Sequence, residues 1–346
     1  MSVPRNLTLL VLCLCTLPLA ALAGSRAQSP KFVSRSRVPR NNGGKTFTLT
    51  DKFNGQTFFD NFDFFNQTDP THGSVNYLSK GDAQAAGLAY VQDDGTVIMK
   101  VDNTTQLSPG QFRNSIQSKN TYSSGLFIAD IYSMPHGCSV WPAFWAVGGN
   151  WPEGGEIDII ENVHDATFNQ MTLHTSAGCS LDNSTAAPSN MSGNYKRTEA
   201  FTSTILSTAC QSSPTYNDGC AFQSTDTASY GHAFNMIAGG VYATLLSSEG
   251  VSIWNFPRTN IPSDILASQP NPSTWGTPAA FWNAQTCDTS EHFTNLQLVF
   301  DITLCGDWAG ATYTSAGCPG TCAEAVADPT KFDYAHWAVN YVAVYQ

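Results

Sequence analysis

From Phe47 onward, the hydrophobic residues fall mainly in short runs rich in β-branched and aromatic side chains. Turn residues bound these runs, which is typical of β-strands. The pattern predicts strands over 96–101, 125–131, 296–301 and 337–345. Helical signals are limited to short pieces, such as the alanine-rich stretch 322–327. Many short strands and few helices predict an all-β fold, either a sandwich or a barrel.

The strand predicted over 337–345 is apolar almost throughout, so we expect it inside a sheet, closing the fold onto the N-terminal strands. Residues 178–235 are rich in Ser, Thr, Asn and Gly and predict long surface loops. Neither an internal repeat nor a clear linker divides 46–346. We therefore expect a single domain over this range.

The segment from Glu156 to Glu161, Glu-Ile-Asp-Ile-Ile-Glu, alternates acids with isoleucines. Successive side chains on a strand point to opposite faces, so Glu156 and Asp158 share a face. Strict alternation would put Glu161 on the isoleucine face. We predict a β-bulge at Ile159 and Ile160 that absorbs one residue and returns Glu161 to the other acids. Carboxylates this close raise one another's pKa, which suits an enzyme that keeps one carboxyl protonated.

Two other interpretations of the three acids are a solvated strand face and a calcium site. A solvated strand face does not explain why all three are acidic with no Lys or Arg between them. A calcium site needs about six to eight oxygens, usually from loops. We therefore expect no metal here.

Three tryptophans, Trp141, Trp145 and Trp151, lie shortly before the acids. The C–H faces of sugar rings stack on indoles, sugar hydroxyls meet acids and amides, and the indole N–H adds a donor. The alternative is that these tryptophans belong to the core, since Trp is highly buried on average. The combination of acids and tryptophans favours a sugar-binding site.

Residues 1–23 predict a secretory signal peptide, with Arg5, an apolar run over 7–19 and a small-x-small cleavage site. The run is too short to span a bilayer, and no later segment approaches about 18 unbroken apolar residues. Residues 24–45 are basic and contain Pro and Gly, which predicts a linker or propeptide. We expect a secreted protein without a membrane span.

Eight of the ten cysteines follow residue 23, and an even number in a secreted chain predicts disulfides, with the pairing left open. A zinc site at Cys318 and Cys322 is a less favoured alternative, because no His stands at ligand spacing. Four Asn-x-Ser/Thr sequons after residue 23 fit a glycoprotein. They begin at Asn66, Asn103, Asn183 and Asn190.

Charge is distributed unevenly, because all 27 acidic residues follow residue 45 whereas seven of the 16 basic residues lie within residues 1–45. An acidic domain repels nucleic acid and anionic membranes and suits a neutral ligand.

The segment 155–161 resembles, in its bulged form, the Glu-x-Asp-x-x-Glu signature of glycoside hydrolase family 16. Further segments are similar to fungal secreted laminarinase-type endo-1,3(4)-β-glucanases, namely 141–145, 150–152, 173–176, 299–303, 305–310 and 339–345. The resemblance implies a β-jelly-roll sandwich of two curved antiparallel sheets, concanavalin-like, with a concave substrate cleft. It also implies a retaining double displacement without a cofactor.

Carried onto this chain, the resemblance implies that Glu156 is the nucleophile and Glu161 the general acid/base. Asp158 then holds the nucleophile and tunes the distribution of protons. Retention requires carboxyls about 5–5.5 Å apart, which two acids on one strand face can reach across a bulge.

His174 matches a position that faces the cleft, where it would bind the acid/base or a sugar, or be a satisfied histidine of the sheet. Trp145, Trp151 and Trp308 match cleft aromatics, and Trp141 joins them in the expected substrate-binding platform.

These features predict a monomeric, secreted endo-β-glucanase acting on β-1,3 or mixed β-1,3/1,4 glucan. One alternative is a cell-wall transglycosylase of the same family, whose members more often carry the unbulged signature. Another is a non-catalytic glucan-binding lectin on the same sandwich, against which the three intact acids argue. Other β-glycans, including β-1,3-galactan, remain open because loops such as 178–235 and 255–292 set specificity.

Overall fold

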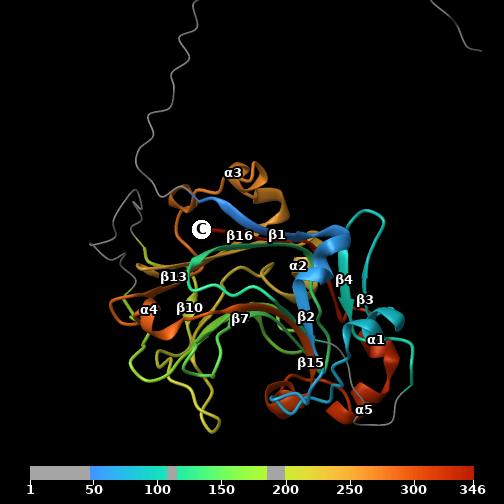
Figure 1. The fold of residues 1–346 in the computed structure, drawn as a ribbon. Coiled ribbons are helices and arrows are strands. Elements are labelled where there is room, and N and C mark those ends of the chain that lie inside the picture. The colour runs from blue at the N-terminus through green and yellow to red at the C-terminus, as the bar shows by residue number, and fades with distance from the viewer. Residues whose placement is uncertain (1–46, 107–114, 185–198) are drawn as a thin grey trace, which may run out of the picture. The chain divides into compact units, whose positions relative to one another are not determined.

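The computed structural model describes residues 47–106, 115–184 and 199–346, which all fall within one compact unit. The segments 1–23 and 24–45, expected to be a signal peptide and a linker, lie outside the described residues. Two antiparallel sheets stack as layers, with β1, β13 and β16 in one and β7, β10 and β15 in the other (Figure 1). The predicted all-β sandwich is confirmed.

Each sheet has eight strands within the described part of the chain. Sheet A contains, in spatial order, β14 (Ala280–Asn283), β13 (Gly250–Pro257), β12 (Gly240–Ser247), β6 (Gly125–Ser133), β16 (His336–Tyr345), β4 (Val97–Lys100) and β3 (Ala89–Val91), with β1 (Leu49–Asn54) also paired to β16. Sheet B contains β10 (Thr204–Ile205), β11 (Cys220–Gln223), β9 (Gln170–His174), β8 (Glu156–Glu161), β7 (Val140–Val147), β15 (Gln297–Leu304), β5 (Ser115–Ser118) and β2 (Phe62–Phe65).

Helices are short and lie in the connections. The α-helices are α1 (Lys80–Ala85), α2 (Gly231–Met236), α3 (Ser263–Leu266), α4 (Thr289–His292) and α5 (Cys322–Ala327). Turns of 3-10 helix occupy Gly55–Asn61, Arg258–Asn260, Pro272–Thr274 and Pro329–Phe332, and a π-helical turn occupies Gly306–Gly310. In the part of the chain that the structure describes, no helix is both long and apolar enough to cross a bilayer.

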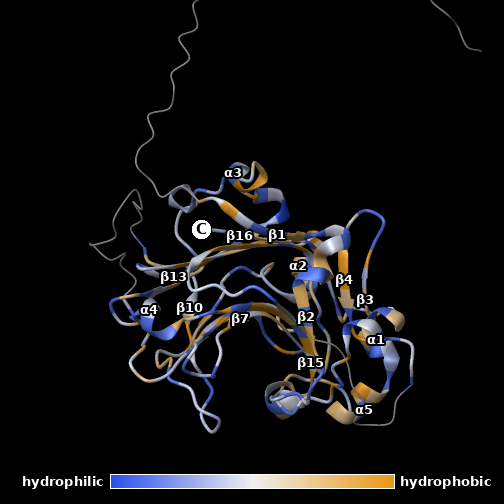
Figure 2. Cartoon of the chain, viewed as in Figure 1, coloured by the Kyte–Doolittle hydropathy of each residue, from blue (hydrophilic) through white to orange (hydrophobic). Residues whose placement is uncertain are grey.

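Aromatic side chains join the two sheets through the core. Phe144 of β7 stacks on Phe300 of β15 with ring centroids 4.4 Å apart. Phe300 in turn meets Trp337 of β16 edge to face at 5.4 Å. Because Trp337 belongs to sheet A, these contacts tie the layers together, and all three side chains are fully buried. Figure 2 shows the strands coloured mainly as hydrophobic and the connections mainly as hydrophilic.

The C-terminal strand confirms its predicted place, because β16 pairs with β1, β4 and β6. The alanine-rich stretch forms α5 as predicted. The expectation of loops throughout 178–235 was wrong in part, because β11 pairs with β9 and extends sheet B. Packing against β9 buries this four-residue strand, and composition dominated by polar neighbours did not indicate it.

All eight cysteines after residue 23 form disulfides. The pairs are Cys138–Cys318, Cys179–Cys287, Cys210–Cys220 and Cys305–Cys322. The zinc alternative was wrong, since Cys318 and Cys322 bond to different partners. Cys138–Cys318 links the segment just before α5 to the start of β7, and Cys305–Cys322 links α5 to the end of β15.

The turn between β7 and β8 requires glycine at its end. Gly155 has a φ of +77°, and a Cβ there would lie 2.1 Å from the carbonyl oxygen of His292. Only glycine combines this backbone conformation with so close an approach of another chain segment. Because β8 begins at the next residue, this packing fixes where Glu156 stands.

We expect Gly155→Ala to lower the free energy of unfolding by about 2 kcal/mol or more, because the added Cβ strains φ and meets main chain. Gly149→Ala in the same turn is the matched control, since a Cβ there meets nothing within 4 Å. The control should change stability by less than about 0.5 kcal/mol. Urea denaturation measures both, and equal midpoints for the two variants would contradict the expectation.

Candidate active site

A bulge in β8 brings the three acids onto one face of sheet B. The register with β7 passes from Trp145 opposite Asp158 to Phe144 opposite Ile160, so Ile159 has no partner. The register with β9 likewise jumps from Asp158 to Glu161. The predicted bulge is confirmed. It allows all three isoleucines, Ile157, Ile159 and Ile160, to be buried in the core while the acids face the other way.

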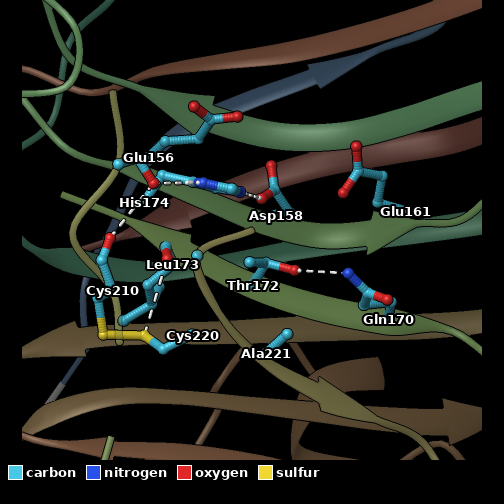
Figure 3. A network of polar contacts seen from close by, with 12 residues as sticks. Glu156, Asp158, Glu161, Gln170, Thr172, Leu173, His174, Cys210, Cys220 and Ala221 are labelled. Carbon is cyan, nitrogen blue, oxygen red and sulfur yellow. Dashed lines mark hydrogen bonds and ion pairs between the residues drawn. A yellow bond between two sulfur atoms is a disulfide. The ribbon is translucent and has the colours of Figure 1, made fainter. Parts of the chain in front are cut away.

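Each acid of β8 lies opposite a polar residue of β9. Glu156 pairs with His174, Asp158 with Thr172 and Glu161 with Gln170. Figure 3 shows the three carboxyls pointing to the same side of β8, beside these β9 residues. The Gln170 amide donates to Thr172 Oγ1 at 3.3 Å. Sequence reasoning missed Thr172 and Gln170, although they lie two and four residues before His174 and therefore share its face of the strand.

Two of the four predicted tryptophans donate their indole N–H groups to the glutamates of β8. Trp151 Nε1 donates to Glu156 Oε2. Trp141 Nε1 donates to Glu161 Oε1 at 2.8 Å. These indoles are half-buried beside the acids. The expectation that the N–H groups would serve as donors to sugar therefore needs correction, because the carboxylates already take them.

The other two predicted aromatics lie in the same neighbourhood. Trp145 Nε1 donates to Asp301 Oδ2 at 3.0 Å. Trp308 contacts Trp141 edge to face, with ring centroids 5.7 Å apart. The structure thus brings all four predicted tryptophans to the face of sheet B that carries the acids.

Asp301 is a fourth carboxyl of this face, and sequence reasoning did not single it out. It pairs with Ala143 of β7, which in turn pairs with Glu161, so the two acids lie in one row across the sheet. Burial raises the pKa of Asp301 well above its usual range, and the charges of Asp69 and Glu161 add to the effect. The available signal was a single acid within an otherwise apolar strand.

His174 is buried, and both of its ring nitrogens have neighbours. Its Nε2 lies 3.2 Å from Asp158 Oδ2, and its Nδ1 lies 2.9 Å from Ser212 Oγ. The Ser212 hydroxyl donates to the carbonyl of Cys210 at 3.4 Å, which leaves its oxygen able to accept a hydrogen bond from an Nδ1–H of His174. The Cys210–Cys220 disulfide thereby helps to orient a histidine that faces Asp158.

Burial and neighbouring charge make the acids hold protons at unusually high pH. Burial first, then the charge of Asp158, raises the pKa of Glu156 to about 8. Burial also raises the pKa of Glu161 to about 7, although the hydrogen bond from Trp141 acts in the opposite direction. Burial and the charge of Glu161 raise the pKa of Asp158 well above its usual range.

Titration of such close carboxyls belongs to the cluster rather than to one residue. These pKa directions do not tell which glutamate attacks. They do mean that the cluster retains a proton near neutral pH, as a general acid requires.

Glu156, Asp158 and His174 also form a set of three ligand atoms that lie within 4.8 Å of one another and could hold a metal ion. Carboxylate with imidazole suits zinc or another transition metal better than calcium, which prefers more oxygens. An ion there would occupy Glu156 and Asp158 together.

The model of the family described as XgeA-like, catalytic GH16 domain, matches residues 62–345. The chain belongs to glycoside hydrolase family 16. It is 42% identical over 306 residues to a probable glycosidase of Schizosaccharomyces pombe, covering 87% of this chain and 70% of the relative. It covers only 40% of a probable endo-1,3(4)-beta-glucanase of Aspergillus niger, at 39% identity.

Two solved family 16 structures are similar to the sandwich. Laminarinase 16A from Phanerochaete chrysosporium, solved with β-glucans in donor and acceptor sites, is 38% identical with a TM-score of 0.80. An elongating family 16 β-1,3-glucosyltransferase is also 38% identical, with a TM-score of 0.79. Each match covers 87% of this chain and 100% of the solved one. The expected β-jelly-roll sandwich and the glycoside hydrolase class are therefore confirmed.

The acids of β8, which are partly or fully buried, should destabilise the fold at high pH. A carboxyl whose pKa is higher in the folded than in the unfolded protein adds stability below its unfolded pKa, and that stability is lost as pH rises through the folded pKa. For Glu161 this window runs from its ordinary value of 4.5 to about 7. In Glu161→Gln the side chain at position 161 cannot ionise, so this variant should be more stable than the wild type at pH 8, by on the order of 1–3 kcal/mol.

Urea denaturation at pH 4 and pH 8 checks this expectation, and the advantage of Glu161→Gln should disappear at pH 4. The control is Glu153→Gln, which alters an exposed carboxyl in the preceding turn. A Glu161→Gln protein less stable than the wild type at pH 8 would contradict the account.

Proposed function

We propose that the chain is a secreted, retaining endo-β-glucanase that hydrolyses β-1,3 or mixed β-1,3/1,4 glucan. The observation that carries the proposal is the β8 bulge, which puts Glu161 on the face of Glu156 and Asp158. The printed names of the relatives and the glucans bound to laminarinase 16A support the substrate class. The chain spans less than half of the A. niger relative, so the proposal concerns this catalytic domain.

In the proposed reaction, Glu161 protonates the glycosidic oxygen while Glu156 attacks the anomeric carbon. The bond to the leaving sugar breaks, and an ester forms between the sugar and Glu156. Glu161 then removes a proton from water, which attacks the same carbon and releases Glu156 as a carboxylate. Two displacements return the original configuration at that carbon.

The neighbours of these acids fit the two roles. Trp151 donates to Glu156 and stabilises its ionised form, which is the attacking species. Burial and then the charge of Asp158 raise the pKa of Glu156, so a proton on Asp158 would favour the ionised, attacking form of Glu156. The exposed parts of Trp141 and Trp308 offer faces on which sugar rings stack. No step requires a cofactor.

The remaining organisation completes the proposal. Residues 1–23 serve as the signal peptide, 24–45 as a basic linker or propeptide, and 46–346 as the catalytic domain. Four disulfides support folding in an oxidising compartment. We propose a monomer that acts alone on neutral polysaccharide.

Transglycosylation by the same site is the second candidate. The elongating glucosyltransferase matches this chain as well as the laminarinase does, so overall similarity does not separate transfer from hydrolysis. Both reactions share the sugar–Glu156 ester and differ in whether water or a sugar hydroxyl receives the sugar. The lectin alternative is weaker because the chain retains every acid of the signature.

We expect Glu156→Gln and Glu161→Gln each to lower the kcat on laminarin by about 10³-fold or more while the protein stays folded. Reducing-sugar release from laminarin, lichenan, β-1,3-galactan and chitin measures the loss and the linkage preference. Glu153→Gln should behave as the wild type. Near-wild-type laminarin hydrolysis by Glu156→Gln would contradict the assignment of Glu156 as the nucleophile. Labelled oligosaccharide acceptors added to the wild type distinguish the two candidates, since elongated labelled products indicate transfer.

Metal removal should leave the activity intact, because no proposed step uses an ion. We expect full laminarin hydrolysis after EDTA treatment and inhibition by added Zn²⁺, which would bind at Glu156, Asp158 and His174 and block the nucleophile. Loss of activity in EDTA with recovery on adding Zn²⁺ would show the opposite, that the metal is required.

A further inference from the structure

The bulge of β8 leaves main-chain groups that neither neighbouring strand pairs. The ladders to β7 and β9 both skip around Ile159 and resume by Glu161. The side chain of Asn169 takes up these groups. Its Nδ2 donates to the Ile159 carbonyl at 2.8 Å, and its Oδ1 accepts from the Glu161 N–H at 3.0 Å. One carboxamide thus spans the bulge.

Asn169 is itself held firmly. It is fully buried and directly precedes β9. Its own N–H donates to Ser229 Oγ at 3.0 Å, and its carbonyl accepts from the Ser224 N–H at 2.8 Å. The Ser229 hydroxyl donates to the carbonyl of Asp226 at 2.6 Å. The loop 224–229 therefore anchors the main chain of Asn169 on both sides while its side chain reaches β8.

We propose that Asn169 is a positioning residue for the general acid/base Glu161. By fixing the peptide groups on either side of the bulge, its carboxamide sets the direction of the Glu161 side chain toward Glu156 and the sugar. Asn169 touches neither substrate nor the Glu161 carboxyl and acts through main chain alone. The inference rests on the proposed function, in which Glu161 protonates the leaving sugar.

The chemistry of proton donation supplies a specific test. A sugar leaving group needs a proton from Glu161, whereas 2,4-dinitrophenolate leaves without one. A displacement of about 1 Å at a reacting group lowers a rate by about 10²-fold. We therefore expect Asn169→Leu to lower kcat/KM about 100-fold on laminari-oligosaccharides and less than about 10-fold on 2,4-dinitrophenyl β-laminaribioside.

Azide gives a second readout. When Glu161 no longer activates water, azide attacks the anomeric carbon of the sugar–Glu156 ester, the ester C–O bond breaks, and a β-glycosyl azide forms with release of the Glu156 carboxylate. Asn169→Leu and the reference variant Glu161→Ala should both form this azide from the dinitrophenyl substrate. The wild type should form almost none.

Asn235→Leu is the matched control. The Asn235 carboxamide also bonds both main-chain groups of one residue, accepting from the Met134 N–H at 2.8 Å and donating to its carbonyl at 2.9 Å. It does so at the end of β6, away from β8. We expect a similar loss of thermal stability from Asn235→Leu but equal, small changes in kcat/KM on both substrates and no glycosyl azide.

The outcomes separate the claims. An Asn169→Leu protein that loses activity equally on both substrates, or that keeps wild-type kcat on glucan, overturns the positioning role. A Glu161→Ala protein without leaving-group dependence and without azide product overturns the acid/base assignment, and the inference with it. Should Asn169→Leu fail to fold, Asn169→Asp carries the same test, because it keeps an acceptor for the Glu161 N–H and loses the donor to Ile159. For Asn169→Asp we expect kcat/KM to fall more on laminari-oligosaccharides than on the dinitrophenyl substrate, with a smaller difference than for Asn169→Leu.

Discussion

The extra residue in β8 is the constraint on which the site depends. A regular strand would bury Glu161 and expose Ile160, because side chains alternate. With Ile159 unpaired, all three isoleucines enter the core and all three acids face outward. The burial of the isoleucines, which stabilises the fold, and the clustering of the acids, which forms the site, therefore both come from the bulge. The glycine turn before β8 and the carboxamide of Asn169 hold the two ends of this irregular stretch in place.

Three of the carboxyls on this face receive a hydrogen bond from a neutral donor. Indole N–H groups reach Glu156, Glu161 and Asp301. A lysine or arginine at the same distance would pull the pKa of each acid down and remove the proton needed for acid catalysis. An indole orients the carboxylate without adding charge. The tryptophans thus serve the acids as well as offering surface to a sugar, which explains why several are gathered on one short stretch of chain.

Much of this arrangement could be predicted from local sequence. The pattern of acids and isoleucines over six residues indicates the bulge. An apolar run indicates β16, and an alanine-rich run indicates α5. Asn169 could not be found in this way, because its role depends on contacts with β8 that no local pattern records. Asp301 was hidden for a similar reason, since one acid in an apolar strand is informative only when β7 brings it into line with Glu161. The cysteine pairs and β11 depend on packing between distant segments.

The identity of the residue that bonds to the sugar tests the central claim most directly. The folded wild-type protein would be treated with 2,4-dinitrophenyl 2-deoxy-2-fluoro-β-laminaribioside, in which fluorine slows release of the sugar from the enzyme. Peptide mass spectrometry then locates the added sugar. The account predicts a single adduct on Glu156, with an added mass equal to that of the fluorinated disaccharide less one water. An adduct on Glu161 or Asp158, or a protein that turns over glucan without ever forming an adduct, would contradict it.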